Sequence, residues 1–230
     1  MKGRLHLSVR LLTAVLVASS TLLATAIGTE ASSGYRTIWV PLYRQIYGLD
    51  CEAAALQMAL AHERIYVSQN RILNTIGIDG RQPVRDATGF HWGNPNTSFV
   101  GNVNGSEIKQ TGYGVYAPAV SRAARQLGGR VMDARQGFAV GDIYGALSAG
   151  HPVVAWVSFD WRAHTPTSYV AFDGTTVGYG SPYEHAVTLY GITPNYVLVN
   201  NPWHGYRQWI RKSTFKTAFS AFNNMAVVLW

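Results

Sequence analysis

The sequence predicts an α+β domain in which a helical first half packs on a mostly antiparallel sheet formed by the second half. Alanine-rich and amphipathic segments that suit helices begin at residue 51. β-Branched and aromatic runs that suit strands dominate after residue 150. With 230 residues, 47% hydrophobic and 13% charged, the chain is long enough for one well-buried core and does not resemble a disordered protein.

The first 26 residues have the pattern of a secretory signal peptide. Lys2, Arg4 and Arg10 precede an apolar stretch, and Ala24-Thr25-Ala26 forms a small-x-small cleavage site. An uncleaved anchor is the alternative, which the polar residues 19–21 within the apolar stretch disfavour. We therefore expect a secreted or cell-envelope protein with a short lead-in at 27–36 and one domain over 37–230.

The expected elements then follow in chain order. A strand at 37–40 ends at Pro41, and the most strongly helical segment runs from Cys51 to His62 with Asp50 as its N-cap. Further helices are expected at 68–76, 117–127, 140–149 and 213–222. Strands are expected at 152–159, 186–192, 196–200 and 226–229, with a hairpin at 170–178 around Gly174. Residues 77–118, rich in glycine and asparagine, are expected to form a long ordered loop or insertion beside a cleft.

The charge pattern excludes some partners. The formal charge of +7 falls to +4 when residues 1–26 are removed, and the remaining basic residues are scattered. This density does not suit a nucleic-acid surface, whereas a weak attraction to an anionic cell envelope stays open. The sequence has no HExxH helix and no cluster of Cys and His, so no metal or organic cofactor is expected. The oligomeric state is not indicated.

Cys51 is the single cysteine, so it cannot belong to an intramolecular disulfide. It lies at the start of the predicted helix, where partial positive charge and free N–H groups lower a thiol pKa. A buried packing role is the alternative. Gln45 lies six positions before Cys51 in the sequence, and a glutamine amide can donate a hydrogen bond to a developing oxyanion. The alternative is that Gln45 is simply a polar residue of a loop.

A base and a residue to orient it follow downstream. His185 begins a strand, and Asn201 precedes Pro202 at the end of the next one. His151, His204 and Asn200 are competing positions. His185 and Asn201 follow Cys51 at about the 130–150 residues that separate these groups in papain-type enzymes.

In this order of residues the chain resembles the C39-like cysteine peptidases, which have a papain-like fold. The matching segments begin at Val40, Leu49, Gly150, His185 and Val197. The resemblance implies Cys51 as nucleophile, His185 as base, Asn201 as orienting residue and Gln45 as oxyanion donor. It assigns His151 a structural role. The family commonly has Gly after the cysteine and Asp before the proline, where this chain has Glu52 and Asn201.

The sequence thus predicts a secreted cysteine peptidase that cleaves a peptide or protein substrate. A cell-wall amidase or an acyl transferase on the same fold is one alternative. A non-catalytic envelope-binding module is the other. Glu52 follows the predicted nucleophile directly, and a carboxylate there opposes ionisation of the thiol. Glu184, beside His185, is a further acid whose side-chain direction the sequence does not indicate.

Overall fold

The computed structural model describes residues 34–180 and 182–230. The chain divides into two units, Met1–Glu30 and Ala31–Trp230, and the fold described below belongs to the second. The expected signal peptide at 1–26 and most of the lead-in at 27–36 lie outside the described residues, so they stay predictions. Within the described part of the chain, no helix is both long and apolar enough to cross a membrane.

A seven-stranded antiparallel sheet forms the centre of the domain. Its strands are β1 (Arg36–Thr37), β6 (Val131–Arg135), β7 (Val153–Ser158), β10 (Glu184–Ile192), β11 (Tyr196–Asn201), β12 (Tyr206–Arg211) and β13 (Ala226–Leu229). They run in the order β12-β11-β10-β7-β13-β6, and β1 pairs with β10. Every residue of β7 and β10 is buried. Their near-continuous apolar sequence therefore reflects burial on both faces of the sheet.

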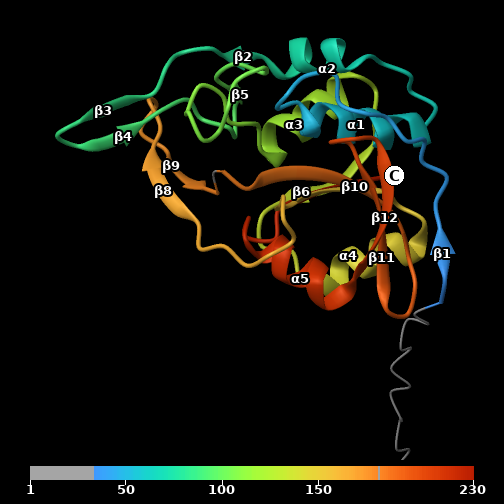
Figure 1. The fold of residues 1–230 in the computed structure, drawn as a ribbon. Coiled ribbons are helices and arrows are strands. Elements are labelled where there is room, and N and C mark those ends of the chain that lie inside the picture. Colours follow the sequence, from blue (N-terminus) through green and yellow to red (C-terminus); the bar gives the residue numbers. More distant parts are fainter. Residues whose placement is uncertain (1–33, 181) are drawn as a thin grey trace, which may run out of the picture. The chain divides into compact units, whose positions relative to one another are not determined.

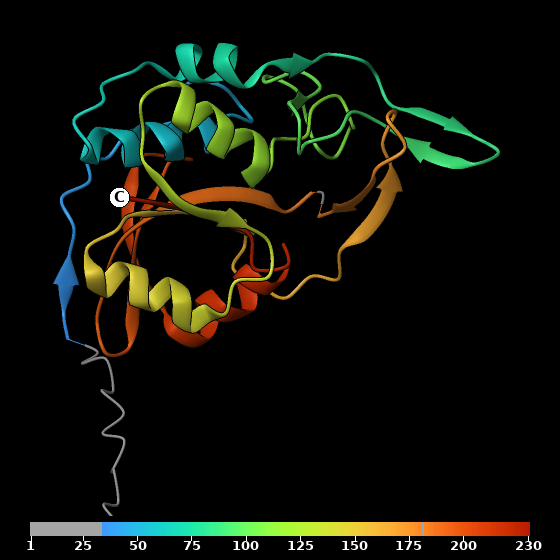
Figure 2. The same ribbon diagram turned by 180° about the vertical axis from the view of Figure 1, so that it is seen from behind.

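Helices cover both faces of this sheet (Figures 1 and 2). On one face lie α1 (Cys51–His62), α2 (Gln69–Ile76) and α3 (Ala117–Gln126), and on the other lie α4 (Val140–Ala149) and α5 (Lys212–Ser220). Helix α1 packs against β10 and β7. Ten of its twelve residues are buried, because α2, α3 and the sheet surround it. The predicted α+β class and the packing of the helix that begins at Cys51 on an antiparallel sheet are confirmed.

Most element bounds agree with the sequence prediction. The predicted first and last residues are correct for α1, α4 and β13. The ends differ from the prediction by one or two residues in the other three helices and in β7, β10 and β11. The hairpin is formed by β8 (Thr167–Val170) and β9 (Thr176–Tyr179), so its turn is wider than predicted. Residues 38–40 are extended but outside the strand, and the sequence analysis missed β6 and β12.

The glycine-rich segment 77–118 is more regular than a loop. It contains β2 (Ile78–Asp79), β3 (Val84–Asp86), β4 (Gly89–His91) and β5 (Phe99–Val100). Trp92, Phe99 and Tyr113 are fully buried and belong to the main hydrophobic core. Gly101 has φ +82°, and a Cβ there would lie 2.7 Å from Cα of Gly112. Close approach of two backbone segments thus accounts for part of the glycine content.

Candidate active site

Cys51 is the first residue of α1 and is 4% exposed. Its Sγ accepts a hydrogen bond at 3.3 Å from the backbone N–H of Ala186 on β10, which ties the helix start to the sheet. Asp50 occupies the predicted N-cap position but its side chain makes no cap hydrogen bond. One of its carboxylate oxygens instead accepts from the N–H of Tyr47 at 2.9 Å, which closes the loop before the helix.

His185 and Asn201 meet across β10 and β11. The Nε2 atom of His185 lies 2.9 Å from Oδ1 of Asn201, and both side chains are buried. The strands pair directly in antiparallel register. The competing residue Asn200 faces away, since its amide donates to the carbonyl of Pro41 at 3.1 Å. The structure therefore pairs His185 with Asn201 and uses Asn200 to hold the segment that leads to Cys51.

The hydrogen bonds around Asn201 determine the tautomer of His185. Oδ1 of Asn201 accepts from the N–H of Trp203 at 3.0 Å, and Nδ2 donates to Oε1 of Gln208 at 3.0 Å. A backbone N–H is always a donor, so the amide orientation is fixed by its neighbours. His185 must then donate its Nε2–H to Oδ1, which leaves the lone pair on Nδ1.

Two aromatic rings screen this pair from solvent. Phe159 packs edge-on against the His185 ring with centroids 5.2 Å apart, and Trp203 packs edge-on against Phe159 at 5.5 Å. The other candidate histidines lie elsewhere. His151 packs against Trp230 at 5.2 Å, and His204 contacts the ring of Trp203 outside the cavity lining.

Gln45 lies in the cavity wall, but its amide is engaged by its own loop. Nε2 donates to the carbonyls of Tyr47 at 2.9 Å and Gly48 at 3.0 Å. Both amide protons thus already have acceptors, and Oε1 is buried without a hydrogen-bond partner. In this structure Gln45 and Cys51 line the same cavity. To stabilise an oxyanion, the Gln45 amide would have to give up its hydrogen bond to the carbonyl of Tyr47 or Gly48.

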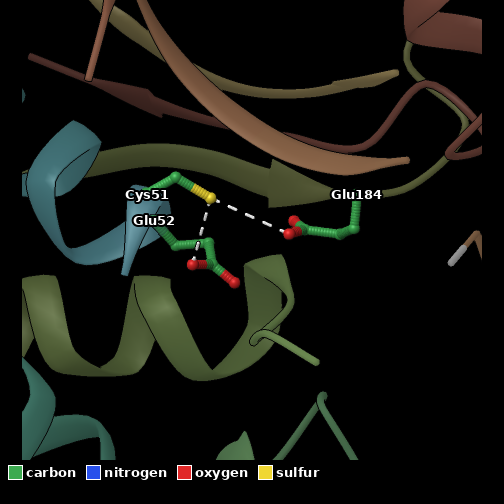
Figure 3. Close-up of side chains that lie close together, drawn as sticks. All are labelled: Cys51, Glu52 and Glu184. Carbon is green, nitrogen blue, oxygen red and sulfur yellow. Dashed lines mark hydrogen bonds between the residues drawn. The ribbon is translucent and has the colours of Figure 1, made fainter. Parts of the chain in front are cut away.

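Two buried carboxylates face the thiol (Figure 3). The Cys51 thiol lies 3.4 Å from Oε2 of Glu52 and 3.8 Å from Oε2 of Glu184. The other oxygen of Glu52 accepts a short hydrogen bond from the N–H of Val115. Both acids are visible in the sequence, but the direction of the Glu184 side chain is not. Neighbouring residues of a strand ordinarily point to opposite faces, so the position next to His185 did not indicate that Glu184 reaches the thiol.

Burial and these acids reverse the expected effect of the helix N-terminus. Burial raises the pKa of the Cys51 thiol well above its ordinary value, and Glu184 and Glu52 raise it further wherever they are ionised. Burial lowers the pKa of His185 to about 4, against a smaller opposing effect of Asn201. The expected lowering of the thiol pKa is therefore wrong for the resting state, in which thiol and imidazole are both neutral.

The carboxyl groups also keep their protons. Burial raises the pKa of Glu52 to about 8, and burial together with Glu52 raises the pKa of Glu184 well above its ordinary value. Asp50, before the helix, has a pKa raised to about 6 by burial. At neutral pH the two glutamates that face Cys51 are therefore mostly protonated, whereas Asp50 is mostly ionised.

Cys51 and His185 open into one cavity of about 350 Å³. Its walls are mainly apolar and aromatic, with Gln45, Glu107 and Glu184 as polar groups. The lining residues are Gln45, Gly48, Leu49, Cys51, Gly105, Ser106, Glu107, Ile108, Phe159, Pro182, Glu184, His185 and Trp203. Residues 105–108 come from the glycine-rich segment, which thus supplies the wall that the sequence predicted.

The fold and the site together define a class of protein: a papain-like α+β domain with a thiol and an imidazole in one cavity. Residues 37–227 match the model of the Peptidase_C39 like family, and the chain belongs to this family. The family is of peptidase type. The uncharacterized protein YvpB of Bacillus subtilis (strain 168) is 24% identical over 189 residues, which cover 78% of this chain and 68% of YvpB.

A solved structure shows the same fold. A Bacillus anthracis protein proposed to be a C39-like peptidase superposes with a TM-score of 0.70 and 24% identity, over 85% of this chain and 97% of that one. A double-glycine motif protease from an AMS/PCAT transporter, solved with a leader peptide, has a TM-score of 0.47 and 17% identity, over 84% and 91% of the two chains.

Proposed function

We propose that the protein is a cysteine peptidase that cleaves peptide bonds by acyl transfer to Cys51. The observation that carries the proposal is the tautomer of His185. Asn201 accepts the Nε2–H, so Nδ1 offers a lone pair, and the imidazole shares one cavity with the only thiol of the chain. A positioned base beside a nucleophile is the requirement for covalent catalysis at a carbonyl group.

The charges indicate general-base catalysis rather than a preformed ion pair. In the resting state both Cys51 and His185 are neutral. As the sulfur attacks the peptide carbonyl, Nδ1 of His185 takes the thiol proton. The imidazolium then protonates the leaving amine, and water releases the acyl group from sulfur by the reverse sequence. Asn201 supports the imidazolium through its neutral carbonyl oxygen, more weakly than an aspartate would.

Oxyanion stabilisation is assigned to the backbone N–H of Cys51 and the amide of Gln45. The first N–H groups of a helix have no intrahelical acceptor, so the Cys51 N–H is suited to a developing negative charge. Gln45 would exchange its hydrogen bond to the carbonyl of Tyr47 or Gly48 for one to the oxyanion. Such bonds often form only in the complex with substrate.

The decisive experiment compares full-length protein with Cys51→Ala and His185→Ala on a peptide library, on folded proteins and on peptidoglycan fragments. His62→Ala is the matched control, because His62 lies at the far end of the same helix and its Nδ1 bonds to the carbonyl of Trp39, away from the cavity. We expect peptide cleavage by the wild type and His62→Ala and loss of cleavage in the two site variants.

Other outcomes identify the alternatives. Turnover of peptidoglycan fragments without peptide cleavage would indicate a cell-wall amidase, and transfer to an added amine would indicate an acyl transferase. Equal activity of wild type and Cys51→Ala would reject the proposal, as would a purified protein without turnover of any of the substrates.

We also propose that the protein is exported and acts outside the cytoplasm, on the basis of the signal pattern at residues 1–26. Mass spectrometry of the native protein tests this. A mature N-terminus after residue 26 or close to residue 31 supports export, whereas a chain that still begins at Met1 contradicts cleavage.

A further inference from the structure

Three potential metal ligands converge beside the cavity. They are Sγ of Cys51, Oε2 of Glu52 and Oε2 of Glu184, and each pair of these ligand atoms lies within 4.8 Å. Two come from the first turn of α1 and the third from the start of β10, so the contact between helix and sheet creates the cluster (Figure 3). We propose that these three side chains bind a divalent transition-metal ion of the Zn²⁺ type, which blocks the nucleophile and so inhibits the enzyme. The inhibition rests on the proposed function, whereas the binding does not.

The distances suit a tetrahedral ion. Zn–S bonds of about 2.3 Å and Zn–O bonds of about 2.0–2.2 Å place a sulfur and an oxygen ligand about 3.5 Å apart. In the structure Sγ lies 3.4 Å from the Glu52 oxygen and 3.8 Å from the Glu184 oxygen. The two sulfur–oxygen separations therefore need to change by only a few tenths of an ångström, and the two oxygens, within 4.8 Å of each other, would close on the same ion. Cys51 and Glu184 line the cavity, so the ion would enter from it.

An independent observation points to a missing partner at this place. Oε1 of Glu184 is buried and has no hydrogen-bond partner, although Glu184 is only 4% exposed. Its carboxylate points toward the thiol (Figure 3). A buried polar atom without a partner is costly. Oε1 belongs to the same carboxyl group as the ligand atom Oε2, so a cation bound there would take the place of the proton and neutralise the buried group. Moreover, neither lysine nor arginine occurs among the described residues that line the cavity.

The remaining contacts hold the ligands as supporting groups do in known metal sites. The second oxygen of Glu52 accepts from the N–H of Val115, and the sulfur accepts from the N–H of Ala186. Gly114 packs so closely that a Cβ would lie 2.5 Å from the Glu52 carboxylate and 3.1 Å from that of Glu184. The backbone thus fixes the Glu52 carboxylate through the oxygen that faces away from the sulfur, and the close packing of Gly114 confines both carboxylates.

The binding test uses Co²⁺ as a spectroscopic substitute for Zn²⁺ on the reduced full-length protein. We expect one Co²⁺ per chain, a thiolate-to-cobalt charge-transfer band, and displacement of that band by one equivalent of Zn²⁺. Cys51→Ser should abolish the band. Glu52→Gln and Glu184→Gln should each weaken binding by more than the about 10- to 100-fold that loss of a supporting group costs, since each removes a charged ligand while keeping its shape.

A matched control separates this cluster from a surface site. Asp86 lies 3.5 Å from Nε2 of His91, which is the kind of carboxylate–imidazole pair that can bind Zn²⁺ at a surface. Asp86→Asn should leave the band and its affinity unchanged. Absence of the band in the wild type would overturn the proposal, as would a band that survives in Glu184→Gln with unaltered affinity. Thermal unfolding confirms that each variant is folded.

Peptidase activity is measured in the same titration. Zn²⁺ should inhibit cleavage with the affinity found by Co²⁺ displacement, and a chelator should restore it. A charge-transfer band in a protein that cleaves no substrate would leave the metal site standing and reject the proposed function. Cleavage that is insensitive to Zn²⁺, in a protein without the band, would reject the metal site and leave the proposed function standing.

Discussion

Gly114 offers a quantitative test of how the two carboxylates are packed. An added Cβ would lie 2.5 Å from Oε1 of Glu52, a separation that requires something to move. That oxygen accepts the N–H of Val115, so the carboxylate cannot retreat without breaking the bond. Overpacking of a core costs about 1–3 kcal/mol. Leaving a buried donor unsatisfied adds about 1–3 kcal/mol. We therefore expect Gly114→Ala to lower the unfolding free energy by about 2–6 kcal/mol.

For a domain of this size each 1 kcal/mol shifts Tm by about 2–4 °C. The expected fall in Tm for Gly114→Ala is thus about 4–24 °C. Gly141 is the matched control, because it lies inside α4 and an added Cβ would meet nothing within 4 Å. Alanine is about 0.5–1 kcal/mol more favourable than glycine within a helix. Gly141→Ala should therefore raise Tm by about 1–4 °C.

The assay is thermal unfolding of the full-length proteins by calorimetry and circular dichroism in the presence of a chelator. Opposite signs for the two glycine-to-alanine changes would support the packing. A Gly114→Ala protein with the Tm of the wild type would show that the carboxylates do not lie against this backbone, and would remove the geometry on which the metal site depends.

Three further predictions concern charge and orientation at the site. Asn201→Ala should lower kcat/KM by about 10²-fold or more, because the tautomer and position of His185 are no longer fixed; unchanged steady-state kinetics would contradict this. The acid limb of kcat/KM against pH should lie near 4, the pKa of His185, and a limb near 6.5 would mean an exposed imidazole. The pKa of Glu52 is about 8 in the folded protein and ordinarily about 4.5, so the folded state keeps a proton that the unfolded state loses. The unfolding free energy should thus fall as pH rises from 4.5 to 8, and Glu52→Gln should reduce this slope in denaturant titrations; equal slopes would refute it.

The sequence was informative where local chemistry decides the structure. The run from Cys51 to His62 is a strong helix former without glycine or proline, and it folds as the predicted helix. The apolar runs of β7 and β10 likewise became central strands. The order of Gln45, Cys51, His185 and Asn201 predicted residues that the fold brings together around one cavity or, for Asn201, directly behind it.

Tertiary packing decided what the sequence could not. Strand β12 alternates between exposed and half-buried charged, polar and aromatic residues, so it lacks the apolar signal of a strand and is defined by its pairing with β11. The glycine-rich segment contributes Trp92 to the core. The backbone at Gly101 lies against the backbone at Gly112 and against the Trp92 ring, a contact that only the folded chain creates. The pKa of Cys51 depends on Glu184, which is far away in the sequence and approaches the thiol only in the folded chain.

The acyl-enzyme on Cys51 is the most direct test of the proposed mechanism. Full-length protein is mixed with a peptide substrate, quenched in acid during turnover, digested and analysed by mass spectrometry. The account predicts that the fragment containing Cys51 gains the mass of the N-terminal part of the substrate, that Cys51→Ala shows no adduct and no turnover, and that hydroxylamine removes the adduct. Turnover that persists in Cys51→Ala, with the wild-type Cys51 fragment unmodified throughout, would contradict it.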